Sequence, residues 1–307
     1  MKKERDSPTR ESPFFSAPSF HPNSGHWRCG HFLLNYQKRP LIMGILNVTP
    51  DSFSDGGQFF KPEKALEHAL QLVSEGADII DIGGESTRPG ALSVPLEEEA
   101  DRVLPVIRAL AQQVSVPISI DTRKPEIARR AIAAGASILN DVSGLNADAE
   151  MFSVAAEDSN TALVVMHAKG SPQTMQEAPR YDDLIEEVHA FFQGRLSQTD
   201  ALGISRDRIA LDPGIGFGKT IVHNLSLIHK LPCFSEFGVP LLLGPSRKSF
   251  IGDMLDLPPS ERLEGTAAAV AIAVFQGARI LRVHDLVEMR RVLMIAEGIR
   301  KQAPAEE

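Results

Sequence analysis

Polar side chains that can bind a ligand or carry charge recur at the ends of short apolar runs along this 307-residue chain. They comprise two acids, two amides, two cations and a histidine, namely Asp121, Asp212, Asn47, Asn140, Lys248, Arg282 and His284. Carboxylates and amides suit the edge of a flat heterocycle such as a pterin or a purine, because each buried group left unpaired costs about 1–3 kcal/mol. Arginine, lysine and histidine suit a phosphate or a diphosphate, and asparagine is a neutral oxygen ligand for Mg2+. The residue types therefore predict a site for a flat ring and a phosphate group.

Any single polar residue at the end of an apolar run also has an ordinary structural explanation. Asp121 can cap a helix that starts near Pro125, and a lone histidine such as His167 is more often structural than catalytic. The segment PGIGFGKT at 213–220 resembles a phosphate-binding P-loop, but Pro213 stands where that loop requires a glycine. We therefore disfavour an ATPase or a dinucleotide-binding protein, and the predicted site depends on whether the polar residues converge.

Apolar runs rich in Ile, Val and Leu predict the elements that must position these residues. The runs are residues 41–46, 79–82, 117–120, 137–139, 162–166, 209–211, 239–243 and 280–283. They do not alternate apolar with polar residues, which is typical of parallel strands buried on both faces. Helical patterns between them cover residues 62–75, 96–114, 125–134, 181–202, 263–276 and 286–300. Gly76, Gly135 and Gly277 follow three of these patterns, where a left-handed C-cap is favoured.

Eight strand–helix units predict an α/β protein that folds as a single-domain (β/α)8 TIM barrel. An open, doubly wound sheet uses the same alternation, but the strand count and the chain length favour the barrel. In a barrel, the C-terminal ends of all eight strands face one mouth, and active sites are built there. The acids, amides and cations named above would then line a single cavity.

Composition bounds the class of protein. With 43% hydrophobic and 23% charged residues, the chain can bury an ordinary core, which excludes wholesale disorder. The net charge of −8 argues against general nucleic-acid binding. No segment reaches the roughly 18 apolar residues that span a membrane, and no apolar stretch of a secretory signal follows the first residues. The two cysteines, Cys29 and Cys233, fit a reducing compartment, so we expect a cytoplasmic protein. From the charge and the lack of a long apolar segment, we expect neither nucleic-acid nor membrane partners.

Residues 1–38 differ from the rest of the chain. They are rich in Pro, Ser and His and show neither a helical nor a strand period. We expect a flexible or loosely docked N-terminal extension, followed by the barrel domain over residues 39–307. The alternative is a short structured cap over one end of the barrel.

Four motifs, in this order, resemble the dihydropteroate synthase family of bacterial folate synthesis. They are NVTPDSFSDG at 47–56, GGESTRPG at 83–90, DPGIGFGK at 212–219 and SRKSFIG at 246–252. The resemblance covers residues 40–300 and implies a (β/α)8 barrel and a homodimer. It also implies condensation of 6-hydroxymethyl-7,8-dihydropterin diphosphate with 4-aminobenzoate, with release of diphosphate and with Mg2+ as cofactor.

The same resemblance implies a role for each site residue. The pterin would be bound by Asp121, Asn140, Asp212 and Lys248. The diphosphate would be bound by Asn47, Arg282 and His284, with Asn47 also contacting Mg2+. The 4-aminobenzoate side would be formed by Thr87, Arg88, Pro89, Phe217, Ser246 and Lys248. Asp51 and Phe53 would belong to a loop that orders over the reacting centre, and the catalytic residues would be Lys248, Arg282, His284 and Asp51.

The implied mechanism is dissociative substitution, in which diphosphate leaves first and the aromatic amine then attacks the exocyclic methylene. No strong base is needed, because an aniline-type amine is unprotonated at pH 7. Two alternatives stay open. A methyltetrahydrofolate methyltransferase acting on a corrinoid protein gives no reason for the run from Ser246 to Lys248. A non-enzymatic pterin-binding paralogue should have lost loop residues, yet Asn47 and Asp51 are present.

Overall fold

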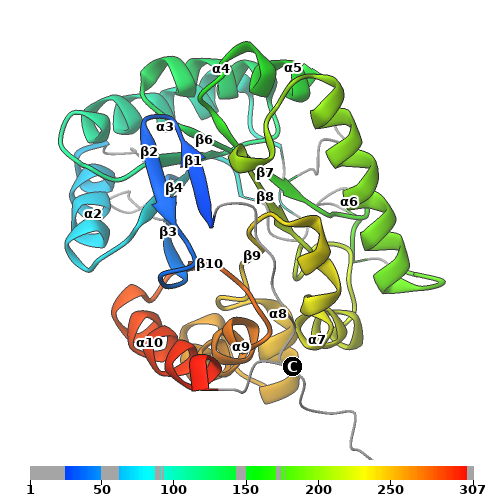
Figure 1. The fold of residues 1–307 in the computed structure, drawn as a ribbon. Coiled ribbons are helices and arrows are strands. Elements are labelled where there is room, and N and C mark those ends of the chain that lie inside the picture. The colour runs from blue at the N-terminus through cyan, green and yellow to red at the C-terminus, as the bar shows by residue number, and fades with distance from the viewer. Residues whose placement is uncertain are drawn as a thin grey trace, which may run out of the picture.

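The structure is a computed structural model that describes residues 25–49, 62–86, 91, 93–142, 150–170, 174–176 and 178–302. Eight parallel strands form one sheet in the order β8-β7-β6-β5-β4-β3-β10-β9 (Figure 1). Their bounds are β3 Leu41–Asn47, β4 Ile79–Gly83, β5 Ile118–Asp121, β6 Ile138–Asp141, β7 Ala162–Met166, β8 Ile209–Asp212, β9 Leu242–Leu243 and β10 Ile280–Val283. The two ends of the sheet meet through a parallel bridge between Leu211 and Leu241. The sheet therefore closes into the predicted barrel rather than staying an open, doubly wound sheet.

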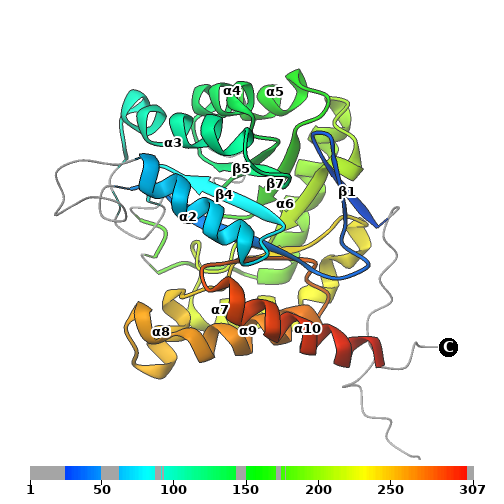
Figure 2. The ribbon, with the colours of Figure 1, turned by 90° about the vertical axis from the view of Figure 1, so that its left-hand side faces the viewer.

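Helices surround the strands on the outside of the barrel, as Figures 1 and 2 show. Their bounds are α2 Pro62–Ser74, α3 Leu96–Ala111, α4 Pro125–Ala134, α5 Glu150–Glu157, α6 Leu184–Ala201, α7 Ile221–His229, α8 Ser249–Leu255, α9 Leu263–Phe275 and α10 Leu286–Gln302, with short 3-10 helices η1 Arg206–Arg208, η2 Leu231–Phe237 and η3 Pro259–Glu261. Gly76, Gly135 and Gly277 have φ values of 97°, 117° and 99°, which confirms the left-handed turns predicted there.

Three helices, α5, α7 and α8, have no counterpart among the predicted elements. They are only 7 to 9 residues long, too short for a clear amphipathic period. The start of α7 is nonetheless encoded locally. The Thr220 hydroxyl accepts a hydrogen bond from the His223 N–H, and His223 Nδ1 accepts one from the Thr220 N–H. This is a capping box in which histidine replaces the usual glutamate or glutamine.

Strand β9 is shorter than the predicted run at 239–243. Pro240 has no N–H to donate to a ladder, so regular pairing begins only at Leu242. The carbonyl oxygen of Pro240 still accepts a hydrogen bond from the Leu211 N–H at 3.0 Å. The proline thus shortens the strand without opening the barrel.

The segment 25–38 is not the flexible or loosely docked extension that was expected. Strands β1 His26–Cys29 and β2 Phe32–Asn35 form an antiparallel hairpin that lies across one end of the barrel (Figure 1). Trp27 is fully buried, and its Nε1–H donates to the Arg208 carbonyl at 3.0 Å. The reason is hydrophobic: Trp27, Cys29 and Tyr36 pack against residues at the N-terminal ends of the strands, such as Ile79. The cap alternative therefore holds for this segment, and residues 1–24 lie outside the described part.

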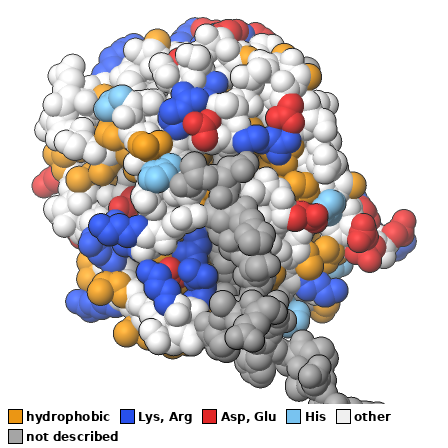
Figure 3. All heavy atoms as spheres, viewed as in Figure 1, with side chains coloured by type: hydrophobic (Ala, Val, Ile, Leu, Met, Phe, Trp, Pro, Cys, Tyr) orange, Lys and Arg blue, Asp and Glu red, His pale blue; other side chains and the backbone are white. Residues whose placement is uncertain are grey.

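An ion pair between Arg28 and Asp207, at 3.0 Å, also ties the hairpin to the barrel. Figure 3 shows Lys and Arg side chains beside Asp and Glu side chains at several places on this face.

Within the described residues, no helix is both long enough and apolar enough to cross a membrane.

Removing the indole of Trp27 should destabilise the barrel. We expect Trp27→Ala to lower the free energy of unfolding by about 3–5 kcal/mol, because removal of the large indole leaves a cavity between the hairpin and the barrel end. Urea unfolding followed by circular dichroism measures this change. Leu33→Ala on the same hairpin is the matched control, because Leu33 is 62% exposed. Equal stability of the two variants would contradict the docking of the hairpin.

Candidate active site

The predicted polar residues converge at the C-terminal ends of the strands. Asn47, Asp121 and Asp212 are the last residues of β3, β5 and β8. Asn140 lies in β6 and pairs in register with Asp121, and Arg282 lies in β10. Since the strands are parallel and the sheet is closed, these side chains share the mouth opposite the hairpin.

Arg282 is the centre of the site. Its Nε donates to Asp81 Oδ2 at 2.6 Å, and its Nη2 donates to Asp121 Oδ2 at 2.8 Å. The Asn140 amide nitrogen in turn donates to the carboxylate of Asp81 at 3.2 and 3.3 Å. Four side chains from β4, β5, β6 and β10 therefore form one network. Asp121 does not cap α4, whose N-cap residue is Lys124.

Two buried acids keep oxygen atoms available for a ligand. Asp121 Oδ1 is buried and has no hydrogen-bond partner among the residues that the structure describes. Burial raises the pKa of Asp121 to about 7, and the charge of Arg282 opposes that rise. Asp212 Oδ1 accepts the Gly214 N–H at 2.7 Å. Burial raises the pKa of Asp212 to about 6. An unpaired buried acceptor is costly, so the arrangement is suited to a ligand that donates hydrogen bonds.

Lys248 and Phe217 are in contact at the mouth. The Lys248 ammonium lies 4.0 Å from the centroid of the Phe217 ring, a cation–π distance. Burial, together with the charge of Arg282, lowers the pKa of Lys248 to about 8. The neighbouring Arg247 has a φ of 56° and forms an ion pair with Asp285, which fixes the turn that carries the lysine.

Ser246 and His284 form a hydrogen-bonded pair. Ser246 Oγ lies 2.9 Å from His284 Nδ1 and accepts the backbone N–H of His284 at 3.2 Å. Burial, together with the charges of Arg282 and Arg247, lowers the pKa of His284 to about 3, so the imidazole is neutral at pH 7. A hydroxyl that donates to Nδ1 leaves the hydrogen on Nε2, and His284 can then donate to a ligand oxygen. In that tautomer, neutral His284 offers an N–H donor rather than a positive charge.

Lys219 stabilises the glycine-rich loop after β8 through its buried side chain. Its buried ammonium donates to His167 Nδ1 at 3.0 Å, to the His167 carbonyl at 3.2 Å and to the Phe217 carbonyl at 3.0 Å. Burial lowers the pKa of Lys219 to about 7 and that of His167 to about 3. Gly214 is required, because a Cβ there would lie 1.9 Å from the His167 carbonyl oxygen. The lysine therefore braces the loop through these three contacts.

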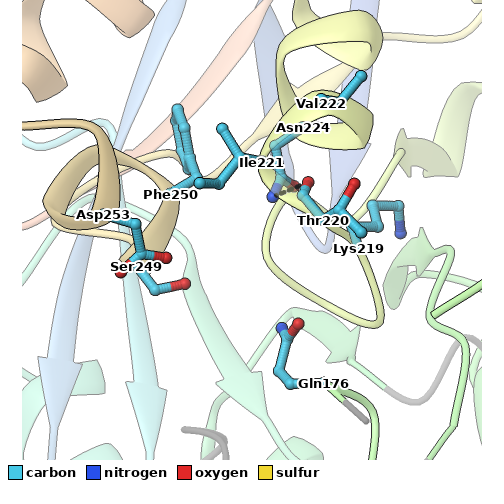
Figure 4. Close-up of a pocket in the computed structure, with 9 residues that line it drawn as sticks. All are labelled: Gln176, Lys219, Thr220, Ile221, Val222, Asn224, Ser249, Phe250 and Asp253. Carbon is cyan, nitrogen blue, oxygen red and sulfur yellow. Dashed lines mark hydrogen bonds between the residues drawn. The ribbon is translucent and has the colours of Figure 1, made fainter. Parts of the chain in front are cut away.

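A hollow of about 360 Å³ lies beside this loop, between the starts of α7 and α8 (Figure 4). It is lined by Gln176, Lys219, Thr220, Ile221, Val222, Asn224, Ser249, Phe250 and Asp253. Gln176 also donates to the Gly216 carbonyl at 2.7 Å and so steadies the loop. Because Ser249 follows Lys248 directly, the hollow borders the segment that carries this lysine.

Part of the predicted site lies outside the described residues. Thr87, Arg88 and Pro89 are in this group, as are Asp51 and Phe53. The adjacent Glu85 is described, and it forms ion pairs with Arg123 and Lys124.

Sequence reasoning overlooked Asp81 as a member of the site. Asp81 sits within the apolar run at 79–82, and a charged residue in a strand that is buried on both faces is a usable signal. It also gave no role to Lys219, which only the fold buries.

Comparison with known proteins agrees with this geometry. Residues 43–284 match the family model described as "Pterin binding enzyme". The dihydropteroate synthase of Synechocystis sp. is 48% identical over 268 residues, which cover 87% of this chain and 92% of that protein. The dihydropteroate synthase of Yersinia pestis, solved with a sulfonamide drug, superposes with a TM-score of 0.84 at 44% identity, over 90% of this chain and 99% of that one.

A third protein, the dihydropteroate synthase of Xanthomonas albilineans in complex with 7,8-dihydropteroate, superposes with a TM-score of 0.80 at 40% identity. The superposition covers 91% of this chain and 100% of that one. The shared barrel, the identity over most of both chains and the match of the family model lead to one conclusion. The chain belongs to the pterin binding enzyme family, among the dihydropteroate synthases.

Proposed function

We propose that the protein condenses 6-hydroxymethyl-7,8-dihydropterin diphosphate with 4-aminobenzoate to form 7,8-dihydropteroate and diphosphate. The observation that carries the proposal is the buried network of Asp81, Asp121, Asn140 and Arg282 at the barrel mouth, with Asp212 and Lys248 beside it. A relative of the same fold binds 7,8-dihydropteroate, which is the product of this reaction.

The pterin ring fits the acceptors of the site. Its ring N–H and amino groups donate hydrogen bonds, and the pocket offers Asp121 Oδ1, the Asn140 oxygen and the second oxygen of Asp212. Acceptors of this kind favour a ligand with matching donors, because a ligand without these donors would leave the buried Asp121 Oδ1 unpaired.

The diphosphate fits the cationic and donor groups at the rim. Arg282 and Lys248 supply positive charge, and neutral His284 supplies an N–H donor. Asn47 ends β3 at the same mouth. Those residues also include no cluster of three or more His, Cys, Asp or Glu that could hold a metal ion by itself.

A neutral amide oxygen at the mouth fits an Mg2+ ion that reaches the site on the diphosphate. We propose that Asn47 contributes one neutral oxygen ligand and that the diphosphate contributes others. When bound, Mg2+ would draw charge from the departing diphosphate. Asn47 would help to orient the bound Mg2+ ion.

The described acids suit a dissociative substitution. As diphosphate departs, positive charge develops at the pterin methylene, and the carboxylates of Asp121 and Asp212 provide a fixed negative field next to it. The amine of 4-aminobenzoate is neutral at pH 7 and attacks without a base. Lys248, whose cation lies over the Phe217 ring, is placed to hold the second substrate beside the first. We propose that sulfonamides compete at this side, as the Yersinia pestis complex suggests.

An assay with the purified protein tests the function. Protein, pterin diphosphate, 4-aminobenzoate and Mg2+ should release diphosphate and 7,8-dihydropteroate, and EDTA should stop the release until Mg2+ is restored. Binding of the pterin without release of diphosphate would instead support a non-enzymatic pterin-binding protein. Methyl transfer to cobalamin would support the corrinoid methyltransferase.

Lys248→Ala and Asp212→Ala should each lower kcat/KM on the order of 10²-fold, because each removes a charged contact at the reacting centre. Both variants should still fold, since neither side chain belongs to the apolar core. Asp212→Ala should melt at a lower temperature than Lys248→Ala, because it leaves the buried Gly214 N–H without its acceptor. Steady-state assays of diphosphate release measure the change. Full activity of either variant with an unchanged melt would contradict its place in the site.

The pH profile should be bell-shaped. Each carboxylate carries negative charge and accepts hydrogen bonds at both oxygens only when ionised, so kcat/KM should rise with pH through the pKa values of Asp212, about 6, and Asp121, about 7. It should fall above the pKa of Lys248, about 8, as that cation is lost. Asp212→Asn removes one titrating group, so residual activity should lose the limb near pH 6. A flat profile between pH 5 and 9 would contradict these assignments.

We further propose a homodimer formed through helices α7 to α10. These helices contact one another and lie together in Figure 1. Most of the exposed large apolar side chains of the described residues lie on them, namely Val222, Leu225, Met254, Leu255, Ile272, Met294, Ile295 and Ile299. Such a concentration of apolar surface is typical of an interface.

Ile295→Glu should dissociate this dimer, because a charge would be buried in the interface. Sedimentation at micromolar concentration should show a monomer for Ile295→Glu and a dimer for the wild type. Leu33→Glu, on the exposed hairpin position, is the control and should stay dimeric. A monomeric wild type would rule out the homodimer.

A cytoplasmic location is the last part of the proposal. Both cysteines are free thiols: Cys29 is buried, and Cys233 is exposed. Burial raises the pKa of the Cys29 thiol and makes it unreactive. An exposed thiol such as Cys233 persists best in a reducing compartment.

A further inference from the structure

We propose that Asp81 is a positioning residue that sets the orientation of the Asn140 amide and thereby the hydrogen-bond pattern that the pocket offers to the pterin. This inference rests on the proposed function. Asp81 itself is fully buried, with no exposed surface. It therefore acts on a ligand only through the residues that it contacts.

The contacts of Asp81 connect two functional side chains. Its Oδ2 accepts Arg282 Nε at 2.6 Å. Both of its oxygens lie within hydrogen-bond distance of the Asn140 amide nitrogen, at 3.3 and 3.2 Å. Asp81 and Asn140 are 59 residues apart in the chain and two strands apart in the barrel, so only the closed sheet brings them together.

The carboxylate determines which end of the amide faces the ligand. An ionised carboxylate has only acceptors, whereas an amide has a donor end and an acceptor end. The donor end of Asn140 must therefore face Asp81, and its oxygen is left for the pocket. Turning the amide over would set two acceptors against each other in a buried place, at a cost of about 1–3 kcal/mol.

Arg282 holds the Asp81 carboxylate in the orientation that faces the Asn140 amide. The guanidinium donates to Asp81 through Nε and to Asp121 through Nη2, so its plane is held at two points. This engagement occupies Asp121 Oδ2, and Asp121 Oδ1 has no partner within the described part of the chain. Asn140 and Asp121 therefore both present oxygen atoms, which is the pattern that a ligand edge with several N–H donors requires.

The isosteric change Asp81→Asn separates this role from simple neutralisation of Arg282. The oxygen of the new amide must accept from Arg282 Nε, so its NH2 group faces Asn140. The Asn140 oxygen then turns toward that NH2 group, and the Asn140 nitrogen turns toward the pterin. A donor would now oppose a donor of the ligand.

The test is a double-mutant cycle on the full-length protein with 6-hydroxymethylpterin as the binding probe and kcat/KM for the pterin diphosphate as the second readout. We expect Asp81→Asn to weaken both by about tenfold in the wild-type background. In the Asn140→Ala background, where no amide is left to turn, the same change should cost less than about threefold. Equal losses in the two backgrounds would show that Asp81 acts by charge alone and would overturn the proposal.

The pair Asp81→Asn with Asn140→Asp is the rescue. A carboxylate at 140 has acceptors on both sides, so it can accept from the new amide and still present an oxygen to the pterin. We expect binding of 6-hydroxymethylpterin within about threefold of the wild type, and a rescue that fails while the thermal melt is normal would count against the proposal. This pair also serves if Asp81→Asn alone does not fold, because it restores the formal charge. A wild type that binds no 6-hydroxymethylpterin would refute the proposed function itself, which is a separate outcome.

Discussion

One buried ion-pair cluster determines the character of this site: the guanidinium of Arg282 held between the carboxylates of Asp81 and Asp121. Two acids this close in a buried place would repel each other and lose hydration, so a cation between them is what allows both to be ionised together. The planar fork of arginine meets both at once. Because the fork uses only one oxygen of Asp121, the other is left as a buried acceptor, and the cluster becomes a receptor for hydrogen-bond donors.

The loop after β8 shows how a similar local sequence can serve a different purpose. A glycine-rich segment that ends in lysine often cradles phosphate. Here the lysine is buried and holds backbone carbonyls of His167 and Phe217, while Gly214 allows the loop to approach His167 closely. The result is a rigid shelf that sets the Phe217 ring against Lys248. Lys248 is therefore the lysine whose ammonium lies at the barrel mouth, and Lys219 stabilises the loop by binding its backbone carbonyls.

Stability and chemistry are separated along the barrel axis. At one end, the hairpin of β1 and β2 seals the strands with Trp27, Cys29 and Tyr36 in an apolar cluster. At the other end, the strands finish in acids, amides and cations, and Asp121 Oδ1 is buried there with no hydrogen-bond partner among the described residues. Unpaired polar groups are costly, and a well-packed opposite end helps the barrel to tolerate them.

The order of strands and helices was readable from the sequence, because continuous apolar runs and helix-ending glycines are local signals. The runs at 162–166 and 280–283 agree with the strands Ala162–Met166 and Ile280–Val283, and residues 125–134 form the helix Pro125–Ala134. The residue types at the strand ends also identified the chemistry, since parallel strands in a barrel share one mouth.

Other features were decided only by the tertiary structure. The hairpin over 26–35 has no strong local pattern, and it forms because Trp27 finds an apolar barrel end to cover. The role of Asp81, the neutrality of His284 and the burial of Lys219 depend on neighbours that are tens to hundreds of residues away in the chain. The physical reason is that strand propensity and helix capping act over a few residues, whereas burial, charge pairing and amide orientation arise only when the closed sheet brings distant side chains together.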